Sequence, residues 1–162
     1  MPRRQRFHRW SEGGMPVSVA CARLADEHAT IAARELGTAI TLAAVGQDWG
    51  SVYWHAGFAV ENILKAIRVK NDGLEVWPDG DRSGKWHDLG YIVERAGVRE
   101  RLRHERRNRA FASCWLATKD WDQGRRYPGN PVTRNEAMDL LNAIRNPTHG
   151  VMRCLSQLYQ NI

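Results

Sequence analysis

The sequence is poor in cysteine, and its three cysteines, Cys21, Cys114 and Cys154, lie far apart in apolar helical patterns. An odd number of distant cysteines suggests neither a disulfide framework nor a zinc site. The histidines share no ligand spacing with one another or with the cysteines, and no Walker-type or Rossmann glycine motif occurs. We therefore expect no metal and no cofactor.

Long apolar runs are also absent, so no segment is expected to span a bilayer. The basic segment Met1–Trp10 lacks the apolar core of a signal peptide, which favours a cytoplasmic protein without membrane contact. Residues 1–15 are expected to form a flexible basic arm in front of a single domain of residues 16–162. A chain of 162 residues that is 43% apolar is long enough for one compact core.

The alternation of apolar and polar residues that marks a strand is missing, whereas apolar residues recur at helical three- and four-residue steps. After Pro16 this spacing predicts a long amphipathic helix that ends near Gly46. A second helix is predicted from Trp49 to the turn at Asn71-Asp72-Gly73. Because the connection between them is short, the two helices are expected to be antiparallel.

The second predicted helix carries Glu61 and Lys65 four residues apart, a spacing that ordinarily gives no more than an exposed ion pair. The segment from Asp72 to Lys85 is rich in Gly and Asp and predicts a long surface loop. Trp77 and Trp86 lie near the ends of this loop. Most of the seven tryptophans suit a core or an anchor, but these two are candidates for stacking on a base.

Shorter helices are predicted in the second half of the chain. Asp88 is expected to cap a helix that Gly97 stops. Glycines and prolines between Asp122 and Pro131 predict a loop, after which Thr133 and Glu136 fit a capping box. Together the segments predict an all-α, antiparallel (up-and-down) bundle of about five or six helices.

Positive charge predominates, with 24 Lys+Arg against 18 Asp+Glu, a net charge of +6 and a pI near 9.6. This balance favours a polyanionic partner, and the high share of arginine favours nucleic acid over a membrane surface. The alternative is that the charge only confers solubility. Arginines are densest from Arg95 to Arg109, where phosphate contacts, including those of Arg103 and Arg107, are expected.

One stretch, Arg145-Asn146-Pro147-Thr148-His149-Gly150, brings a cation, an amide and an imidazole close together. A helix running straight through Pro147 would lose a hydrogen bond and clash with an earlier carbonyl, at a cost of about 3 kcal/mol. Asn146 is a good N-cap and Pro147 a good first helical residue, so a new helix is expected there, with His149 in its first turn. The alternative is a kink that only permits close helix packing.

Four pieces of the chain, between about residue 25 and residue 159, have the order and spacing of a known family. They are Ala59-Val60-Glu61-Asn62-Ile63-Leu64-Lys65-Ala66, His87-Asp88-Leu89, Arg126-Tyr127-Pro128-Gly129, and Arg145-Asn146 followed by His149. On a helical bundle these pieces resemble a HEPN domain, named for "higher eukaryotes and prokaryotes nucleotide-binding".

The resemblance implies a homodimer and, as in many members, a metal-independent ribonuclease of toxin or defence type. Catalysis then falls to Arg145, Asn146 and His149, and a nucleotidyltransferase-type antitoxin is an implied partner. A neutral imidazole can accept a proton from an RNA 2′-hydroxyl and a guanidinium can stabilise the charged phosphate, which would leave a 2′,3′-cyclic phosphate. The family pattern has four to six residues between Arg and His, whereas this chain has three.

The same resemblance also supports a non-catalytic interpretation. Similar tyrosine-proline loops occur in HEPN members that are thought to bind nucleotides or to accompany a nucleotidyltransferase. Arg125 and Arg126 would then hold phosphates, Tyr127 would stack on a base, and Glu61 and Lys65 would lie on the groove. An ordinary turn anchored by an aromatic residue, or a purely structural dimerisation module, are the further alternatives.

Overall fold

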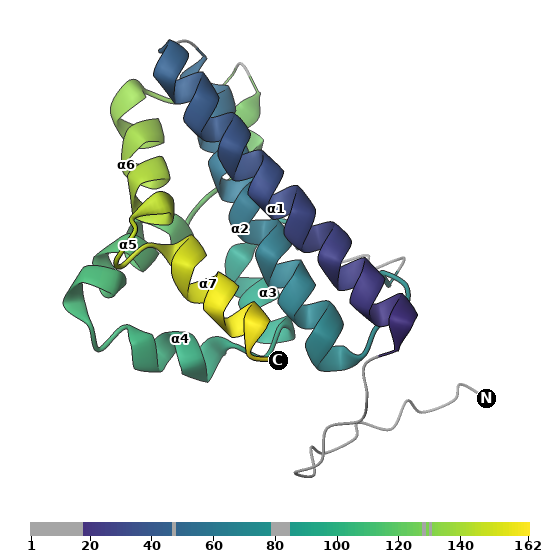
Figure 1. The fold of residues 1–162 in the computed structure, drawn as a ribbon. Helices are drawn as coiled ribbons and strands as arrows, with labels where there is room; N and C mark the ends of the chain where they lie inside the picture. Colours follow the sequence, from purple (N-terminus) through teal and green to yellow (C-terminus); the bar gives the residue numbers. More distant parts are fainter. Residues whose placement is uncertain (1–17, 47, 79–84, 128, 130) are drawn as a thin grey trace.

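The computed structural model describes residues 18–46, 48–78, 85–127, 129 and 131–162, so the expected arm of residues 1–15 lies outside the described residues. Figure 1 shows seven α-helices and one 3-10 helix in this part of the chain, and no strand. The all-α prediction is therefore confirmed. The helices are α1 Val19–Val45, α2 Trp49–Asp72, α3 Leu89–Arg95, α4 Arg99–Glu105, α5 Arg109–Lys119, the 3-10 helix η1 Gln123–Arg126, α6 Arg134–Arg145 and α7 Val151–Gln160.

The two longest helices, α1 and α2, form the antiparallel pair that their short connection predicts (Figure 1). Gly46 ends α1 with a φ of 74°, a left-handed conformation that glycine adopts at no steric cost. Asp48 then caps α2, because its Oδ1 accepts a hydrogen bond from the Ser51 amide at 3.1 Å. Because the C-cap of α1, Gly46, and the N-cap of α2, Asp48, are two positions apart, the two helices can only be antiparallel neighbours.

The central helix is α2, which packs against α1, α3, α6 and α7. Its fully buried side chains, among them Val52, Val60, Leu64 and Ile67, supply much of the core. Burying each such side chain stabilises the fold by roughly 1.5–3 kcal/mol relative to leaving it exposed. A helix with neighbours on so many sides must also bury any polar residue on its inner faces.

The arginine-rich stretch forms α4, a helix that the apolar pattern did not predict. Among its seven residues only Leu102 is buried, so it presents one apolar side chain rather than a stripe. The capping box at the start of α6 is present as predicted. The Glu136 amide donates to Thr133 Oγ1 at 3.3 Å, and the Thr133 amide donates to Glu136 Oε2 at 2.8 Å.

Among the described helices, none combines the length and the apolar character that crossing a bilayer requires.

Candidate nucleic-acid interface

The break predicted at Arg145-Asn146 is present, but the turn that follows it is longer than predicted. α6 ends at Arg145, and Asn146 Oδ1 accepts hydrogen bonds from the amides of Thr148 at 3.0 Å and His149 at 2.8 Å. The Gly150 amide then donates to the Asn146 carbonyl at 2.9 Å. Because α7 begins only at Val151, the prediction that His149 lies in the first turn of a new helix is wrong.

Gly150 explains why α7 starts late. A Cβ atom at this position would lie 2.3 Å from the Asn146 carbonyl oxygen and 2.7 Å from that of Ile144, so the backbone packs closer than any side chain allows. The chain adopts an extended conformation at Gly150, with ψ of 148°, before it becomes helical again. The oxygen of the Asn146 side chain is used to hold this turn, which leaves only its Nδ2 for a ligand.

His149 is half-buried, and its Nδ1 lies 3.4 Å from Nδ2 of Asn108. Asn108 is the N-cap of α5, and its Oδ1 accepts a hydrogen bond from the Ala110 amide at 2.9 Å. This bond orients the side-chain NH2 group toward the imidazole. Since an NH2 group only donates, a hydrogen bond at this contact needs Nδ1 as its acceptor, and the contact favours the tautomer with the proton on Nε2. His149 therefore presents an N–H donor to a ligand.

The arginines from Arg99 to Arg109, a stretch that includes Asn108, the contact of His149, fall into two groups. The paired ones are Arg99 with Glu94, Arg101 with Glu105, and Arg103 with Glu100. Arg106, Arg107 and Arg109 are exposed, and within the described ranges they form no salt bridge. The predicted phosphate contact Arg107 therefore has its charge available, whereas Arg103 is already paired, at 3.4 Å, in an exposed and hence weak pair.

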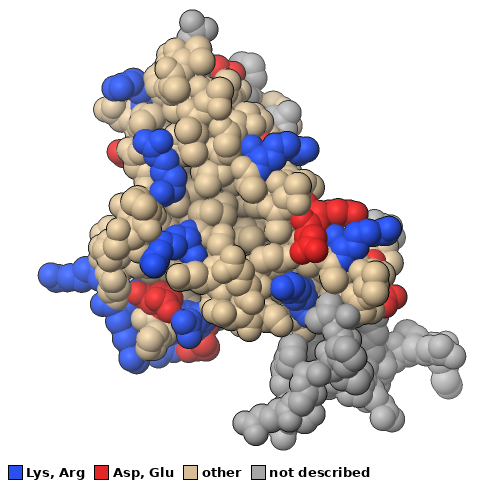
Figure 2. Space-filling view, in the orientation of Figure 1, with Lys and Arg blue, Asp and Glu red and all other residues tan. Residues whose placement is uncertain are grey.

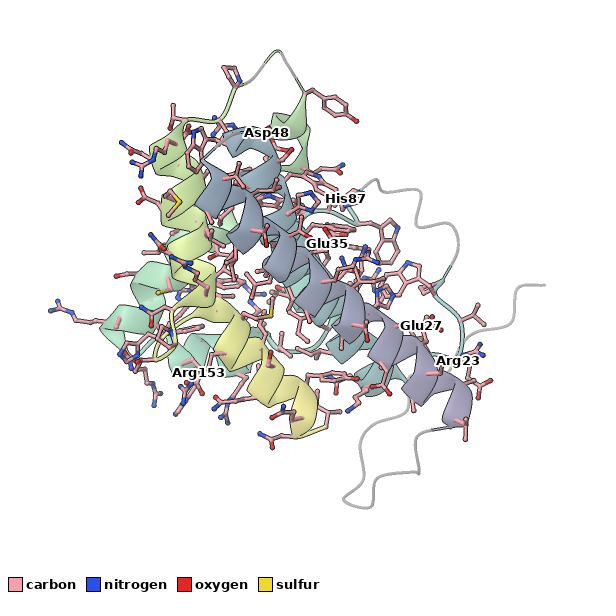
Figure 3. The ribbon with its side chains drawn as sticks, turned by 45° about the horizontal axis from the view of Figure 1, so that its top comes forward. Arg23, Glu27, Glu35, Asp48, His87 and Arg153 are labelled. Carbon is pink, nitrogen blue, oxygen red and sulfur yellow. The ribbon has the colours of Figure 1, made fainter. Side chains whose placement is uncertain are left out.

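Arg106, Arg107, Asn108, Arg109, His149 and Arg153 are named the basic edge. Arg153, labelled in Figure 3, joins α7 to the turn because its Nη1 donates to the Thr148 carbonyl at 2.9 Å. Figure 2 shows Lys and Arg side chains gathered around α4 and its turn to α5, at the lower left, with a few acidic side chains between them. The exposed Arg145 flanks this edge, and its Nε donates to Asn142 Oδ1 at 3.2 Å.

Arg125 and Tyr127 lie in a different part of the molecule. Arg125 donates from Nη1 to Glu136 Oε1 at 2.6 Å and from Nη2 to the Pro131 carbonyl at 2.9 Å. These contacts tie the loop before α6 to its first turn, and the hydrogen bond from Arg125 is the largest cause that lowers the pKa of Glu136 to about 2. Tyr127 is exposed. The side chain of Arg126 lies outside the described residues.

Glu61 and Lys65 are paired, but the pair is not an exposed one, so that prediction is wrong. Glu61 is 0% exposed. Its Oε1 accepts from Lys65 Nζ at 2.5 Å and its Oε2 from His87 Nδ1 at 2.8 Å. Glu61 is buried because it lies on the central helix and because His87, in the segment before α3, packs against it. A buried carboxylate needs such partners to remain charged.

The same part of α2 holds residues that the sequence pattern missed. Arg68 is only 9% exposed, and its guanidinium lies 5.3 Å from the Trp77 ring centroid and 4.8 Å from that of Trp86. Its Nε donates to Asp72 Oδ2 at 3.4 Å, whereas its Nη1 is buried and has no hydrogen-bond partner among the described residues. Glu61, Lys65, Arg68, Trp77, Trp86 and His87 are named the α2 cluster. Glu61, Lys65 and Arg68 follow one another at steps of four and three residues, which indicates that they share one face of the helix. The spacing does not indicate that this face is buried.

A further carboxylate-imidazole pair joins α1 to α2. Glu35, labelled on α1 in Figure 3, is buried, and its Oε2 accepts from His55 Nδ1 at 2.5 Å. Its Oε1 accepts from Arg34 Nη2 at 3.0 Å. Because the two residues of the pair are twenty positions apart, no local spacing in the sequence could have revealed the contact.

The predicted nucleotide-binding residues thus occupy three places rather than one groove. The guanidinium of Arg125 lies 5.6 Å from the ring centroid of Tyr53, which is on α2. Lys65 is on the same helix, twelve residues after Tyr53. That separation corresponds to about 18 Å of helix. Arg103 and Arg107 belong to α4 and the turn after it.

Within the described ranges, no group of three or more His, Cys, Asp and Glu side chains is placed to hold a metal ion. Comparison of the chain with protein-family models, with curated proteins and with solved structures finds no match. The basic edge and the α2 cluster are the two places where the chain's own residues point to a function.

Proposed function

We propose that the chain is a HEPN-like RNA-binding protein that holds the RNA backbone on the basic edge. The observation that carries the proposal is a group of three exposed arginines, Arg106, Arg107 and Arg109, that have no acidic partner among the described residues. They adjoin Asn108, the contact of His149, in the chain. Arginine side chains and an imidazole N–H are donors that phosphate oxygens accept, and such contacts supply most of the affinity for a nucleic-acid backbone.

On this proposal the chain acts as a homodimer in which two basic edges line one cleft, in a toxin or defence role. A nucleotidyltransferase-type antitoxin would then be the neutralising partner. Both statements follow from the resemblance of the four sequence pieces to HEPN domains, and the net charge of +6 is compatible with them.

Cleavage is the second part of the proposal, and it requires that the contact between Nδ1 of His149 and Asn108 open. The 2′-oxygen of RNA would attack the adjacent phosphorus after His149 takes its proton, and Arg145 would stabilise the charge on the phosphate. The bond between phosphorus and the 5′-oxygen would break and that oxygen would take up a proton from water, giving a 2′,3′-cyclic phosphate and a 5′-hydroxyl end. In the present geometry the free nitrogen lone pair is on Nδ1, which faces Asn108 at 3.4 Å. That contact is long and weak enough to open when a substrate binds.

Binding is tested by fluorescence anisotropy with a single-stranded RNA over a series of salt concentrations. Arg107→Ala is expected to weaken binding and to lower the slope of log K against log salt by about 0.7, the value for one phosphate contact on a single strand. Arg23→Ala is the matched control, because Arg23 is equally exposed but is paired with Glu27 on α1, away from Arg153 in Figure 3. Equal losses in the two variants would contradict the proposal.

Cleavage is tested by incubating total RNA with the protein in EDTA, beside His149→Ala and Arg145→Ala. The wild type should produce ends with a 2′,3′-cyclic phosphate, and both variants should produce none. If the wild type binds RNA but leaves it intact, or if His149→Ala cuts equally well, the protein is a binding module and His149 is not its base.

A second candidate function, non-catalytic nucleotide binding, is favoured by Arg68 in the α2 cluster. A buried guanidinium whose Nη1 has no partner in the part of the chain that the structure describes has a donor to offer to an oxyanion, and two indole rings lie beside it. A bound nucleotide would stabilise the fold by mass action, so ATP should raise the Tm of the wild type. Arg68→Gln should abolish the shift. Loss of the shift in Tyr127→Ala instead would assign the nucleotide to the tyrosine-proline loop.

A further inference from the structure

A groove of about 440 Å³ runs between α4 and α7. Its walls include Arg101 and Glu105 on α4, and its other side includes Cys154, Gln157, Leu158 and Asn161. This volume lies within the range of sites that hold small organic groups. In Figure 1, α4 runs below α7 and the two helices approach one another toward the C-terminus.

The groove adjoins the basic edge at both of its walls. Glu105 precedes Asn108, the contact of His149, by three residues. On the other wall, the Cys154 amide donates to the Gly150 carbonyl at 3.2 Å, which places Cys154 one turn, or about 6 Å, along α7 from Gly150. A strand whose phosphate lies at His149 would therefore carry a neighbouring base within reach of the groove.

The chemistry of the groove suits the flat, polar-edged shape of a base. Leu158 and Cys154 are half-buried and pack against the core, and burial is the main cause that raises the pKa of Cys154 to about 11, so the thiol is uncharged. They provide a small apolar surface in a groove whose lining is mostly polar. The exposed carboxamides of Gln157 and Asn161 and the Arg101–Glu105 pair, at 3.0 Å, provide donors and acceptors around it. Amide, guanidinium and carboxylate groups are the side chains that hydrogen-bond to base edges.

We propose that this groove holds one unpaired base of the bound RNA and sets a base preference at that position. The inference rests on the proposed RNA binding, and it names the substrate as single-stranded, because bases of a duplex are not free to enter a groove. The phosphate contacts of the basic edge supply affinity without regard to sequence, whereas the groove reads one base.

The test measures affinity for four single-stranded RNAs that differ in one base, and for a duplex. The wild type should prefer one base by about tenfold or more, the discrimination expected of one good base contact. The double variant Gln157→Ala, Asn161→Ala should bind all four alike with an unchanged salt dependence. Both side chains are exposed, and thermal unfolding checks that the fold is retained. Arg107→Ala is the contrasting variant, which should weaken binding to all four RNAs equally.

The outcomes separate the two proposals. If the wild type binds RNA with no base preference, if the double variant keeps the preference, or if the duplex binds as tightly as the single strands, the groove does not read a base while RNA binding at the basic edge stands. If the wild type binds none of the RNAs, both proposals are overturned.

Discussion

At the scale of single residues, the side-chain amide of Asn108 favours the tautomer of His149 that carries its proton on Nε2. Its oxygen caps α5 and its nitrogen faces the imidazole, so the two ends of one amide link a helix start to the candidate functional histidine. The sequence could identify His149 as a candidate. It could not identify Asn108, because the two residues are 41 positions apart and meet only through tertiary packing.

Asn108→Asp is predicted to switch the tautomer of His149. Aspartate caps a helix as well as asparagine does, but its carboxylate only accepts hydrogen bonds, so the imidazole must present Nδ1–H to it and leave the Nε2 lone pair free. Long-range 1H–15N spectra of the imidazole distinguish the two forms. The wild type should show the Nε2–H form and the variant the Nδ1–H form, with Asn135→Asp, on exposed α6 surface, as the control for added charge. A wild type already in the Nδ1–H form would refute this geometry.

The ion pair of Arg125 and Glu136 is predicted to make stability depend on acid. The pKa of Glu136 is lowered from 4.5 to about 2, chiefly by Arg125, so its contribution is fully present above pH 4.5 and is lost as the pH falls toward 2. Glu136→Gln removes the charge. Urea unfolding should show the wild type more stable than the variant at pH 7, with the difference closing between pH 4.5 and 2. A difference that is the same at every pH would rule out the ion pair as its origin.

At the scale of helices, capping residues in the sequence predicted where α1, α2 and α3 end and where α6 begins. Each of these boundaries depends on residues within a few positions of it. The sequence did not locate α4, where only Leu102 is buried, or the start of α7, which depends on the approach of Gly150 to the Ile144 carbonyl. The buried Glu61 pair was missed for a similar reason. Its spacing is local, but its burial depends on the neighbours of α2.

Two helical glycines are predicted to respond to alanine in opposite ways. At Gly57 on α2 a Cβ atom would lie 2.2 Å from the buried indole of Trp121, and such overpacking typically costs about 1–3 kcal/mol. At Gly37 on α1 a Cβ atom would meet nothing within 4 Å, so alanine should stabilise the helix by about 1 kcal/mol. Urea unfolding of the two variants measures both effects. Stabilisation by Gly57→Ala would mean that Trp121 does not pack on α2 in this way.

At the scale of the whole molecule, charge is divided between two environments. On the basic edge, arginines that have no acidic partner within the described residues face solvent, whereas in the α2 cluster the buried Glu61 is paired with the partly buried Lys65. Composition predicted the excess of positive charge and the arginine-rich stretch. It could not predict this division, because salt bridges to Glu94, Glu100 and Glu105 form only once α3 and α4 are folded.

The most direct measurement of RNA binding at the basic edge is a titration of the 15N-labelled protein with a short single-stranded RNA, followed through the backbone amide signals. The signals of residues 106–109 and 148–153 are predicted to shift together and to saturate, while those of the first turns of α1, around Arg23, stay in place. Shifts confined to residues 61–68 and 85–88 would assign the ligand to the α2 cluster instead, and an unchanged spectrum would contradict RNA binding altogether.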